Sequence, residues 1–428
     1  MTRRLGAVLL LLLACCAPSG FGYSVLTHQQ IIDLAWRESI RPVLLNRYPN
    51  TTDEELRRAE AFAFGGCAIQ DAGYYPFGKV FMSDLTHYVR TGDFVAAFIR
   101  DSRNVDELAF ALGALSHYVG DSYGHQDAVN PSTAVEFPNL AAKYGPVVTY
   151  DESPHSHVRT EFAFDINQLS KRRFAPSAYL QHIGLRVPMR LLEQAFYEIY
   201  GLRLQTMGVD RRAAVDSYRW SVRNFLPSFA HAEVLLHKKS FPDDLPSPDF
   251  DQFQKRLADA DFSNGWEKYR KKAGVKTHLL AFVIVIVPKI GPASDLAIRG
   301  PSQATEQSYV VSVNRTLNRY EELLKDLVQA PAADPLVTMN LENRDLDTGY
   351  RVKPGSYPLT DQTYAKLLDR VVKVGEPIPD RLKQDIEGYY ADPAAPITTR
   401  KNKKAWRRVQ AELLQLQAIP AVPVHQAE

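Results

Sequence analysis

Apolar residues recur at helical spacing through most of this 428-residue chain. One predicted helix begins at Asn104, with Glu107 three residues later as in a capping pair. The apolar positions that follow share one helix face: Leu108, Leu112, Leu115 and Val119. Gly113 lies one turn before His117 and is small enough to let a neighbouring helix approach closely.

Three further stretches show helical periodicity. Thr27 and Gln30 form a second capping pair ahead of an apolar run that starts at Ile31. Residues 179–202 and 210–237 also repeat their apolar positions at helical spacing. No convincing series of alternating strands is visible. The sequence therefore predicts an all-α, multi-helix fold.

A segment rich in proline and aspartate, residues 241–248, is typical of a linker. It divides the chain into a leader at 1–22, a helical domain at 23–240 and a mainly helical extension at 249–428. Within the extension, residues 279–287 form an apolar run of nine residues, too short to span a membrane as a helix. We interpret this run as a buried helix or strand rather than a membrane-dipping segment.

The end of the extension is basic and amphipathic. Six lysines and arginines lie between Arg400 and Arg408, ahead of apolar positions at Trp406, Val409, Leu413 and Leu416. Such a helix can lie on an anionic membrane and make a transient surface contact. A terminal helix that docks by its apolar face is the interpretation we favour.

The first residues indicate export, to a secreted or periplasmic location. Arg3 and Arg4 precede a short apolar run, as in a signal peptide. Small residues around Gly22 permit cleavage before Tyr23, whereas residues 12–15 resemble a bacterial lipobox that would leave a lipidated Cys15. After cleavage before Tyr23 only Cys67 remains of the three cysteines, so no disulfide within the chain is possible.

The charge balance argues against a nucleic-acid partner. The formal net charge is +2, and the two leader arginines supply that excess. The mature chain is therefore near neutral, whereas binding to nucleic acid depends on neutralisation of phosphates by lysine and arginine.

The most informative pattern is a set of metal-binding residue types at i, i+4 spacing. His117, Asp121 and His125 share one predicted helix face, and His157 and Glu161 form a second pair. Zinc needs imidazole and carboxylate atoms that converge within about 2.0–2.2 Å of one point. Eight candidate ligands occur in order: His28, Asp71, His87, His117, Asp121, His125, His157 and Glu161.

In this order the residues resemble the zinc-dependent phospholipases C, whose relatives include single-strand-specific nucleases. The likeness covers residues 23–240. The motifs are an aromatic residue shortly before Thr-His, an Asp well before a His, His-x-x-x-Asp and His-x-x-x-Glu. They correspond here to Tyr23 with Thr27 and His28, to Asp71 with His87, to His117 with Asp121, and to His157 with Glu161.

The resemblance implies a helical fold around three zinc ions. One zinc would be held by Asp71, His87, His117 and Asp121. A second would share Asp121 and take His28 together with the α-amino and carbonyl groups of the mature first residue, Tyr23. The third would take His125, His157 and Glu161. Cleavage before Tyr23 is favoured for this reason, because a lipidated Cys15 would remove the amine ligand.

One departure concerns the third zinc. Many secreted members of the family have a histidine six residues after the bridging aspartate, where this chain has Asp127. His125 at four residues is similar to another branch, which includes glycosylphosphatidylinositol-cleaving enzymes. We choose His125, with Asp127 as the second candidate; if neither binds, the site holds two zinc ions.

The resemblance implies a phosphodiester hydrolase, and most directly a phospholipase C. A metal-bound hydroxide would attack the phosphate and release diacylglycerol and a phosphorylated head group, with Asp71 orienting or deprotonating the water. An aromatic set near Asp71 lines the cleft or belongs to the core: Tyr74, Tyr75, Phe77 and Phe81. The alternatives are a single-strand nuclease, whose family relatives usually carry disulfides, and a catalytically silent, zinc-stabilised protein that binds a membrane or a partner.

Overall fold

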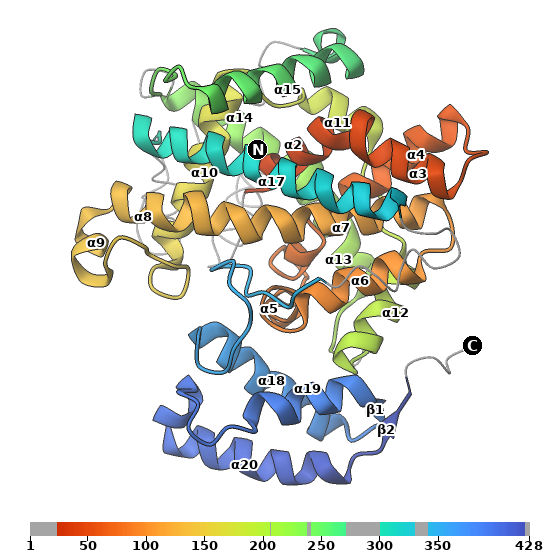
Figure 1. Cartoon of the computed structure of the whole chain (residues 1–428), viewed down its shortest axis with the longest axis vertical. Helices are drawn as coiled ribbons and strands as arrows, with labels where there is room; N and C mark the ends of the chain where they lie inside the picture. The colour runs from red at the N-terminus through yellow and green to blue at the C-terminus, as the bar shows by residue number, and fades with distance from the viewer. Residues whose placement is uncertain (1–23, 206, 238–240, 271–299, 330–340, 424–428) are drawn as a thin grey trace, which may run out of the picture.

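The computed structural model describes residues 24–205, 207–237, 241–270, 300–329 and 341–423. The predicted leader, the lipobox at Cys15, the proposed first residue Tyr23 and the apolar run 279–287 lie outside these ranges. The described part of the chain is built almost entirely from helices, which confirms the predicted all-α fold (Figure 1).

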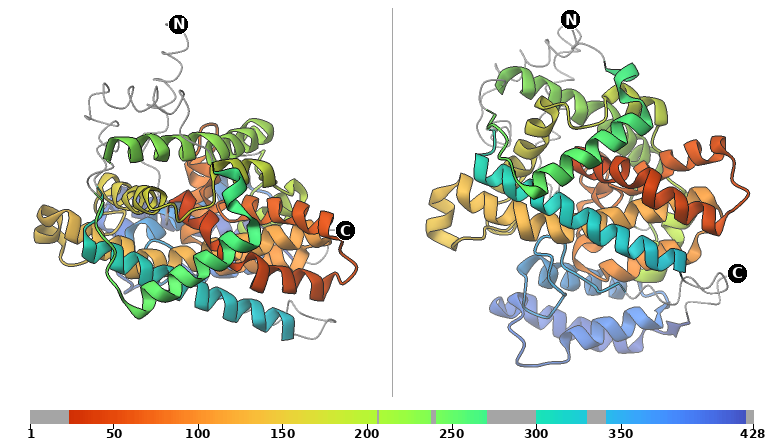
Figure 2. Two further views of the ribbon diagram at one scale, coloured as in Figure 1. Left: turned by 90° about the horizontal axis from the view of Figure 1, so that it is seen from above. Right: turned by 45° about the horizontal axis from the view of Figure 1, so that its top comes forward.

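The elements before the linker occur in this order: α2 (Val25–Ala35), η1 (Trp36–Ile40), α3 (Arg41–Arg47), α4 (Asp53–Gly66), η2 (Gln70–Gly73), α5 (Val80–Tyr88), α6 (Thr91–Asp101), α7 (Val105–Gly124), η3 (His125–Val129), α8 (Asn130–Glu136), α9 (Pro138–Tyr144), α10 (Pro154–Ser170), α11 (Ser177–Ile183), α12 (Met189–Tyr200), α13 (Arg211–Trp220), η4 (Ser221–Phe225) and α14 (Leu226–His237). Helices α8 and α9 project from one end of the body in all three views (Figures 1 and 2).

The described elements after the linker are α15 (Pro248–Asn264), η5 (Trp266–Tyr269), α17 (Gln303–Gln329), α18 (Pro358–Val374), β1 (Ile378–Pro379), α19 (Asp380–Tyr390), η7 (Thr398–Lys401), α20 (Lys403–Ala418) and β2 (Ala421–Val422). The two strands pair in parallel, with Ile378 opposite Ala421. No described helix combines the length and the apolar character that a membrane crossing requires.

Helix α7 forms the centre of the core and packs closely against α4, α6 and α17. Two glycines permit the approach of α4. A Cβ atom on Gly113 would lie 2.2 Å from the carbonyl oxygen of Ala63, and one on Gly66 would lie 2.0 Å from the carbonyl oxygen of Phe110. The prediction that Gly113 permits close helix packing is therefore confirmed.

The two predicted capping pairs have different outcomes. Asn104 caps α7 as predicted, because its side-chain oxygen accepts from the backbone N–H of Glu107 at 3.0 Å. The pair Thr27 and Gln30 does not cap a helix, since α2 already begins at Val25. The Thr27 hydroxyl instead donates to Oδ1 of the buried Asp165 at 2.7 Å, a stronger acceptor than a backbone group.

The predicted helical stretches at 179–202 and 210–237 also differ in how well they agree with the structure. The first is broken, because α11 ends at Ile183, Gly184 adopts a φ of +97°, and α12 begins after Pro188. Periodicity did not reveal that break. The second stretch is helical from Arg211 to His237, with a π-helical turn, η4, between α13 and α14.

Helices after the linker pack onto those before it. Helix α15 contacts α2, α17 contacts α2, α3 and α7, and α18 contacts α5. Residues on both sides of the linker therefore belong to one hydrophobic core. The apolar face of α20 is buried at Val409 and Leu416 and lies against α18, as the favoured interpretation of this terminal helix predicted.

Candidate metal centre

The eight predicted ligand side chains come from six different helical elements and meet inside the protein. His28 lies on α2, Asp71 on η2 and His87 on α5, while α7 supplies His117 and Asp121, η3 supplies His125, and α10 supplies His157 and Glu161. Each of the eight is at most 1% exposed. Burial of so many polar groups requires a compensating interaction.

The side chains form three groups in which the candidate ligand atoms lie within 4.8 Å of one another. The groups are His28, His117 and Asp121; Asp71, His87 and His117; and His125, His157 and Glu161. The third group has the same members as one ligand set that the family resemblance implied, whereas the first two groups share His117 and divide the remaining candidates between them. Tyr23, the predicted source of the amine and carbonyl ligands, lies outside the described residues.

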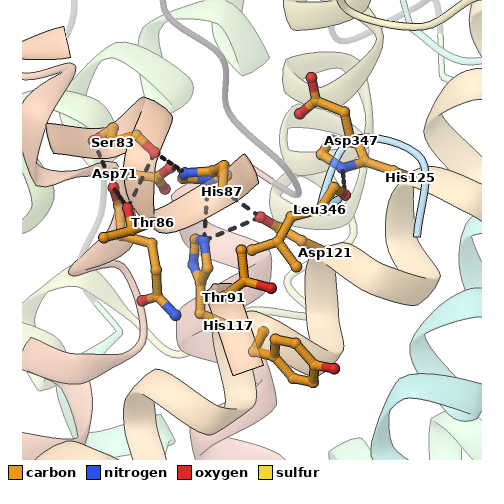
Figure 3. A network of polar contacts seen from close by, with 12 residues as sticks. Asp71, Ser83, Thr86, His87, Thr91, His117, Asp121, His125, Leu346 and Asp347 are labelled. Carbon is orange, nitrogen blue, oxygen red and sulfur yellow. Dashed lines mark hydrogen bonds and ion pairs between the residues drawn. The ribbon is translucent and has the colours of Figure 1, made fainter. Parts of the chain in front are cut away.

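Asp121 joins the first two groups because its two oxygens face different histidines. Its Oδ1 lies 3.1 Å from Nε2 of His28. Its Oδ2 lies 3.0 Å from Nε2 of His117 and 3.5 Å from Nε2 of His87. Figure 3 shows His87, His117 and Asp121 pointing toward one another. A carboxylate in this position can bridge two metal ions.

The second group places three ligand atoms around one point. The Nε2 atoms of His87 and His117 are 3.5 Å apart, and Oδ1 of Asp71 is 3.3 Å from Nε2 of His87. The third group is arranged around Oε1 of Glu161, which lies 2.9 Å from Nε2 of His157 and 3.6 Å from Nε2 of His125.

Three of the histidines are oriented by backbone carbonyls. The Nδ1–H of His87 donates to the carbonyl oxygen of Ser83 at 2.8 Å, and that of His117 donates to the carbonyl oxygen of Cys67 at 3.0 Å. The Nδ1–H of His125 donates to the carbonyl oxygen of Leu346 at 2.5 Å. A carbonyl can only accept, so Nδ1 carries a proton and Nε2 is the nitrogen left to face the other candidate ligands. Metal-binding histidines usually have this arrangement.

The donor set also fits a cation electrostatically. The carboxylate oxygens of Asp71 and Glu161 are buried and make no hydrogen bond within the described residues. A buried carboxylate without a hydrogen bond or a cation is costly. Zinc is suited to this mixture of imidazole nitrogen and carboxylate oxygen. The residues present therefore fit the metal that the resemblance implies.

The pKa directions follow from burial and from neighbouring charges. Burial opposes ionisation of Asp121, but His117 and His28 hold the pKa of that carboxyl well below its ordinary value. Burial lowers the pKa of His28, and burial together with His125 lowers that of His157 well below its ordinary value. Both imidazoles therefore favour the neutral form that binds metal.

Burial raises the pKa of Glu161 well above its ordinary value, and the charge of Asp121 adds to this effect. For His87, burial alone lowers the pKa, but the nearby carboxylates of Asp121 and Asp71 reverse the effect and leave the pKa well above its ordinary value. The site thus concentrates negative charge that a bound cation would offset.

The structure separates the two candidates for the third group. His125 starts the π-helical turn η3 directly after α7 and joins His157 and Glu161. Asp127 instead forms an ion pair with Arg315, with 2.7 Å between its Oδ2 and the guanidinium Nη1. It belongs to none of the three groups found among the described residues. Single π turns occur frequently at functional sites.

The four aromatic residues that follow Asp71 have different environments. The Tyr74 ring lies beside His87, with 5.6 Å between the ring centroids. Tyr75 is buried and packs against Tyr218, whereas Phe77 is 73% exposed. Phe81 is half-buried against the core. Of the four, Tyr74 therefore adjoins the candidate ligands directly.

Two contributors to the site were not found from the sequence. Asp165 accepts from the Leu26 N–H at 3.1 Å and from the Thr27 hydroxyl, which fixes the start of α2 next to His28. The carbonyl of Leu346 holds His125. A backbone carbonyl has no signature in residue type, so only the fold reveals the second contribution.

Residues 27–207 match the family model described as zinc dependent phospholipase C. The matched segment contains all eight candidate ligands, and the predicted family is confirmed for this segment. A search of curated proteins and a search of solved structures return no match.

Proposed function

We propose that this chain, whose residues 27–207 belong to the zinc-dependent phospholipase C family, hydrolyses phospholipids to diacylglycerol and a phosphorylated head group. The observation that carries the proposal is the set of eight buried candidate ligands in three groups, with Asp121 of the first group also in contact with His87 of the second. The intact ligand set favours an active enzyme over a silent zinc-stabilised protein.

We assign one zinc ion to each group. Asp71, His87, His117 and Asp121 would hold the first, and Asp121 with His28 and the amino terminus of Tyr23 the second. His125, His157 and Glu161 would hold the third. When bound, zinc stabilises charge on the phosphate oxygens and lowers the pKa of water toward about 7.

The chain's own residues then have distinct tasks. Asp121 keeps two groups at a fixed separation. Asp71 orients the attacking water and accepts its proton, because its oxygens are buried, accept no hydrogen bond within the described residues and lie in the group with His87. The water oxygen forms a bond to phosphorus while the bond from phosphorus to the diacylglycerol oxygen breaks, and that oxygen then takes a proton.

The proposal includes export and maturation. Cleavage before Tyr23 would free the amine that the second zinc requires, and α2, held by Asp165, begins two residues later at Val25. A protein secreted or held in the periplasm would meet phospholipid directly. A near-neutral mature chain, with Cys67 as its one cysteine, supports a lipid substrate over single-stranded nucleic acid.

The test uses the full mature chain beginning at Tyr23, loaded with zinc. We expect release of phosphorylated head group from phosphatidylcholine micelles, loss of activity with a chelator and recovery with added zinc. Asp121→Asn should lower zinc content by more than one ion per chain and activity by several orders of magnitude. Asp106→Asn is the matched control, because Asp106 lies on the same helix but pairs with Arg58 near the surface.

Two outcomes would contradict the proposal. Full zinc occupancy in Asp121→Asn, measured by elemental analysis, would refute the bridging role. Rapid degradation of single-stranded DNA by the zinc-loaded protein, with every phospholipid tested left intact, would favour the nuclease.

A further inference from the structure

Residues 341–352, which we call the site strap, lie beyond the family-matched segment and cross α5, α6 and α7. The Thr91 hydroxyl donates to the carbonyl oxygen of Arg344 at 2.7 Å and accepts from the Arg344 N–H at 2.9 Å. The Tyr118 hydroxyl donates to the carbonyl oxygen of Glu342 at 2.6 Å. The strap is therefore attached to α7, which carries His117 and Asp121, and to the neighbouring helix α6.

Leu346 lies between two of the ligand groups and is fully buried. Its N–H donates to the backbone carbonyl of His87 at 3.0 Å, and its own carbonyl accepts from Nδ1 of His125 at 2.5 Å. Figure 3 shows the His125 ring directed at this carbonyl. The backbone of one residue thus connects a histidine of the second group with a histidine of the third.

Asp347 fixes the position of that backbone. Its Oδ2 accepts from the hydroxyl of Tyr88 at 2.7 Å and from that of Tyr357 at 2.8 Å. Its carbonyl oxygen accepts from Nδ2 of Asn130 at 2.7 Å. Tyr88 follows His87 directly, and Asn130 follows the π turn that begins with His125. Asp347 is therefore tied to α5, which carries His87, and to the first residue of α8, directly after the turn that carries His125.

Gly349 allows the strap to pack directly on α7. Its φ is +72°, in the left-handed region that favours glycine, and a Cβ atom there would lie 2.1 Å from the carbonyl oxygen of Ser122. Ser122 is the neighbour of Asp121. Any side chain at position 349 would therefore push the strap away from the metal centre.

We propose that the site strap is a working part of the metal centre, in which the Leu346 carbonyl orients His125 and Asp347 is the positioning residue that holds this carbonyl in place. The inference rests on the proposed zinc site but not on any particular substrate. It assigns the part of the chain after the linker a role in the third zinc site.

The strap should act selectively on one zinc ion. His87 and His117 donate to the carbonyls of Ser83 and Cys67, which lie within the family-matched segment. His125 donates to the strap. Displacement of the strap should therefore weaken the third group, whereas the imidazole bonds of the other two groups stay in place. Loss of such an outer partner typically lowers metal affinity about ten- to a hundredfold.

The experiment compares Gly349→Ala with Gly375→Ala in the full mature chain. Gly375 also has a left-handed φ, +65°, but a Cβ atom there would meet only the carbonyl oxygen of Val372 at 3.8 Å. Both substitutions place alanine at a similar left-handed φ, and only the first brings a Cβ atom against the backbone of α7. Zinc per chain is measured by elemental analysis after dialysis against chelators of increasing strength, and the visible spectrum of the cobalt-substituted protein is recorded.

We expect Gly349→Ala to lose one zinc ion at a chelator strength about ten- to a hundredfold lower than wild type and to change the cobalt spectrum. Gly375→Ala should match wild type in both readouts. Tyr357→Phe removes one hydrogen bond to Asp347 and should weaken the same zinc by a smaller factor. If Gly349→Ala does not fold, the zinc affinity of the milder variant Tyr357→Phe tests the proposal.

Unchanged affinity for all zinc ions in the folded Gly349→Ala and Tyr357→Phe variants would overturn the role of the strap. Zinc affinity is measured without substrate turnover, so the role of the strap and the proposed phospholipase activity can be refuted independently. A wild-type protein that binds zinc but cleaves no phospholipid would refute the proposed substrate and leave the strap inference intact.

Discussion

A buried glutamate on α4 makes the stability of the fold depend on pH. Glu60 is 4% exposed, and its Oε1 accepts a hydrogen bond from the hydroxyl of Tyr179 at 2.8 Å. Burial raises the pKa of Glu60 from 4.5 to about 7, although the Tyr179 bond lowers it. Nearby, burial and the charge of Glu60 raise the pKa of Asp33 well above its ordinary value.

The sign and size of the effect follow from linkage. Between pH 4.5 and 7 the folded state binds the Glu60 proton more tightly than the unfolded state, so stability falls as the pH rises through this window. The rise in pKa from 4.5 to about 7 corresponds to about 3 kcal/mol, a cost that is complete above pH 7. Glu60→Gln removes the titrating group and keeps the size of the side chain and an oxygen acceptor for Tyr179.

We therefore predict that the free energy of unfolding of Glu60→Gln rises relative to wild type by about 3 kcal/mol between pH 4.5 and about pH 8. Urea unfolding of both proteins at the same zinc concentration measures this difference, and effects of pH on the metal ligands cancel. Glu54→Gln, on the same helix but exposed, is the matched control and should lack the trend. A constant difference between Glu60→Gln and wild type across the range would refute the reasoning.

Three further predictions follow from the site and the core. His125→Ala should lose about one zinc per chain by elemental analysis, whereas Asp127→Asn should lose none; the reverse result would make Asp127 the ligand. Gly113→Ala should destabilise the protein by about 1–3 kcal/mol in urea unfolding, because its Cβ would meet the α4 backbone, whereas Gly388→Ala, with open space around it, should be neutral or stabilising. Exported protein should begin at Tyr23 by intact mass, and an added N-terminal methionine should weaken one zinc; a diacylated Cys15 would contradict this maturation.

The clustering of the candidate ligands was predictable because part of the geometry is local. His117 with Asp121, and His157 with Glu161, are one helical turn apart, and the structure places Nε2 of each histidine within 3.0 Å of the carboxylate that follows it. Helical spacing alone brings such pairs together. The all-α fold was predictable for the same reason, since it depends on the periodicity of apolar residues within single helices.

Other features depend on groups that the sequence pattern does not mark. Thr27 has the residue type and spacing of a helix cap, but the buried carboxylate of Asp165 competes successfully for its hydroxyl. The helix break after Ile183 depends on a left-handed Gly184, and glycine by itself is compatible with several conformations. In each case tertiary contacts or backbone conformation override a local preference.

The metal centre shows how the two kinds of information combine. The i, i+4 pairs on α7 and α10 bring candidate ligands together within a single helix, but His125 is oriented only when residues after the linker fold back across α7. The carbonyl of Leu346 is 221 residues away from His125 in the sequence. Closure of so long a loop costs conformational entropy, which the packing of α15 and α17 on the first helices offsets. Zinc affinity at the third group should therefore depend on the stability of the whole core, because the strap is held by that core and not by the helix that carries the ligand.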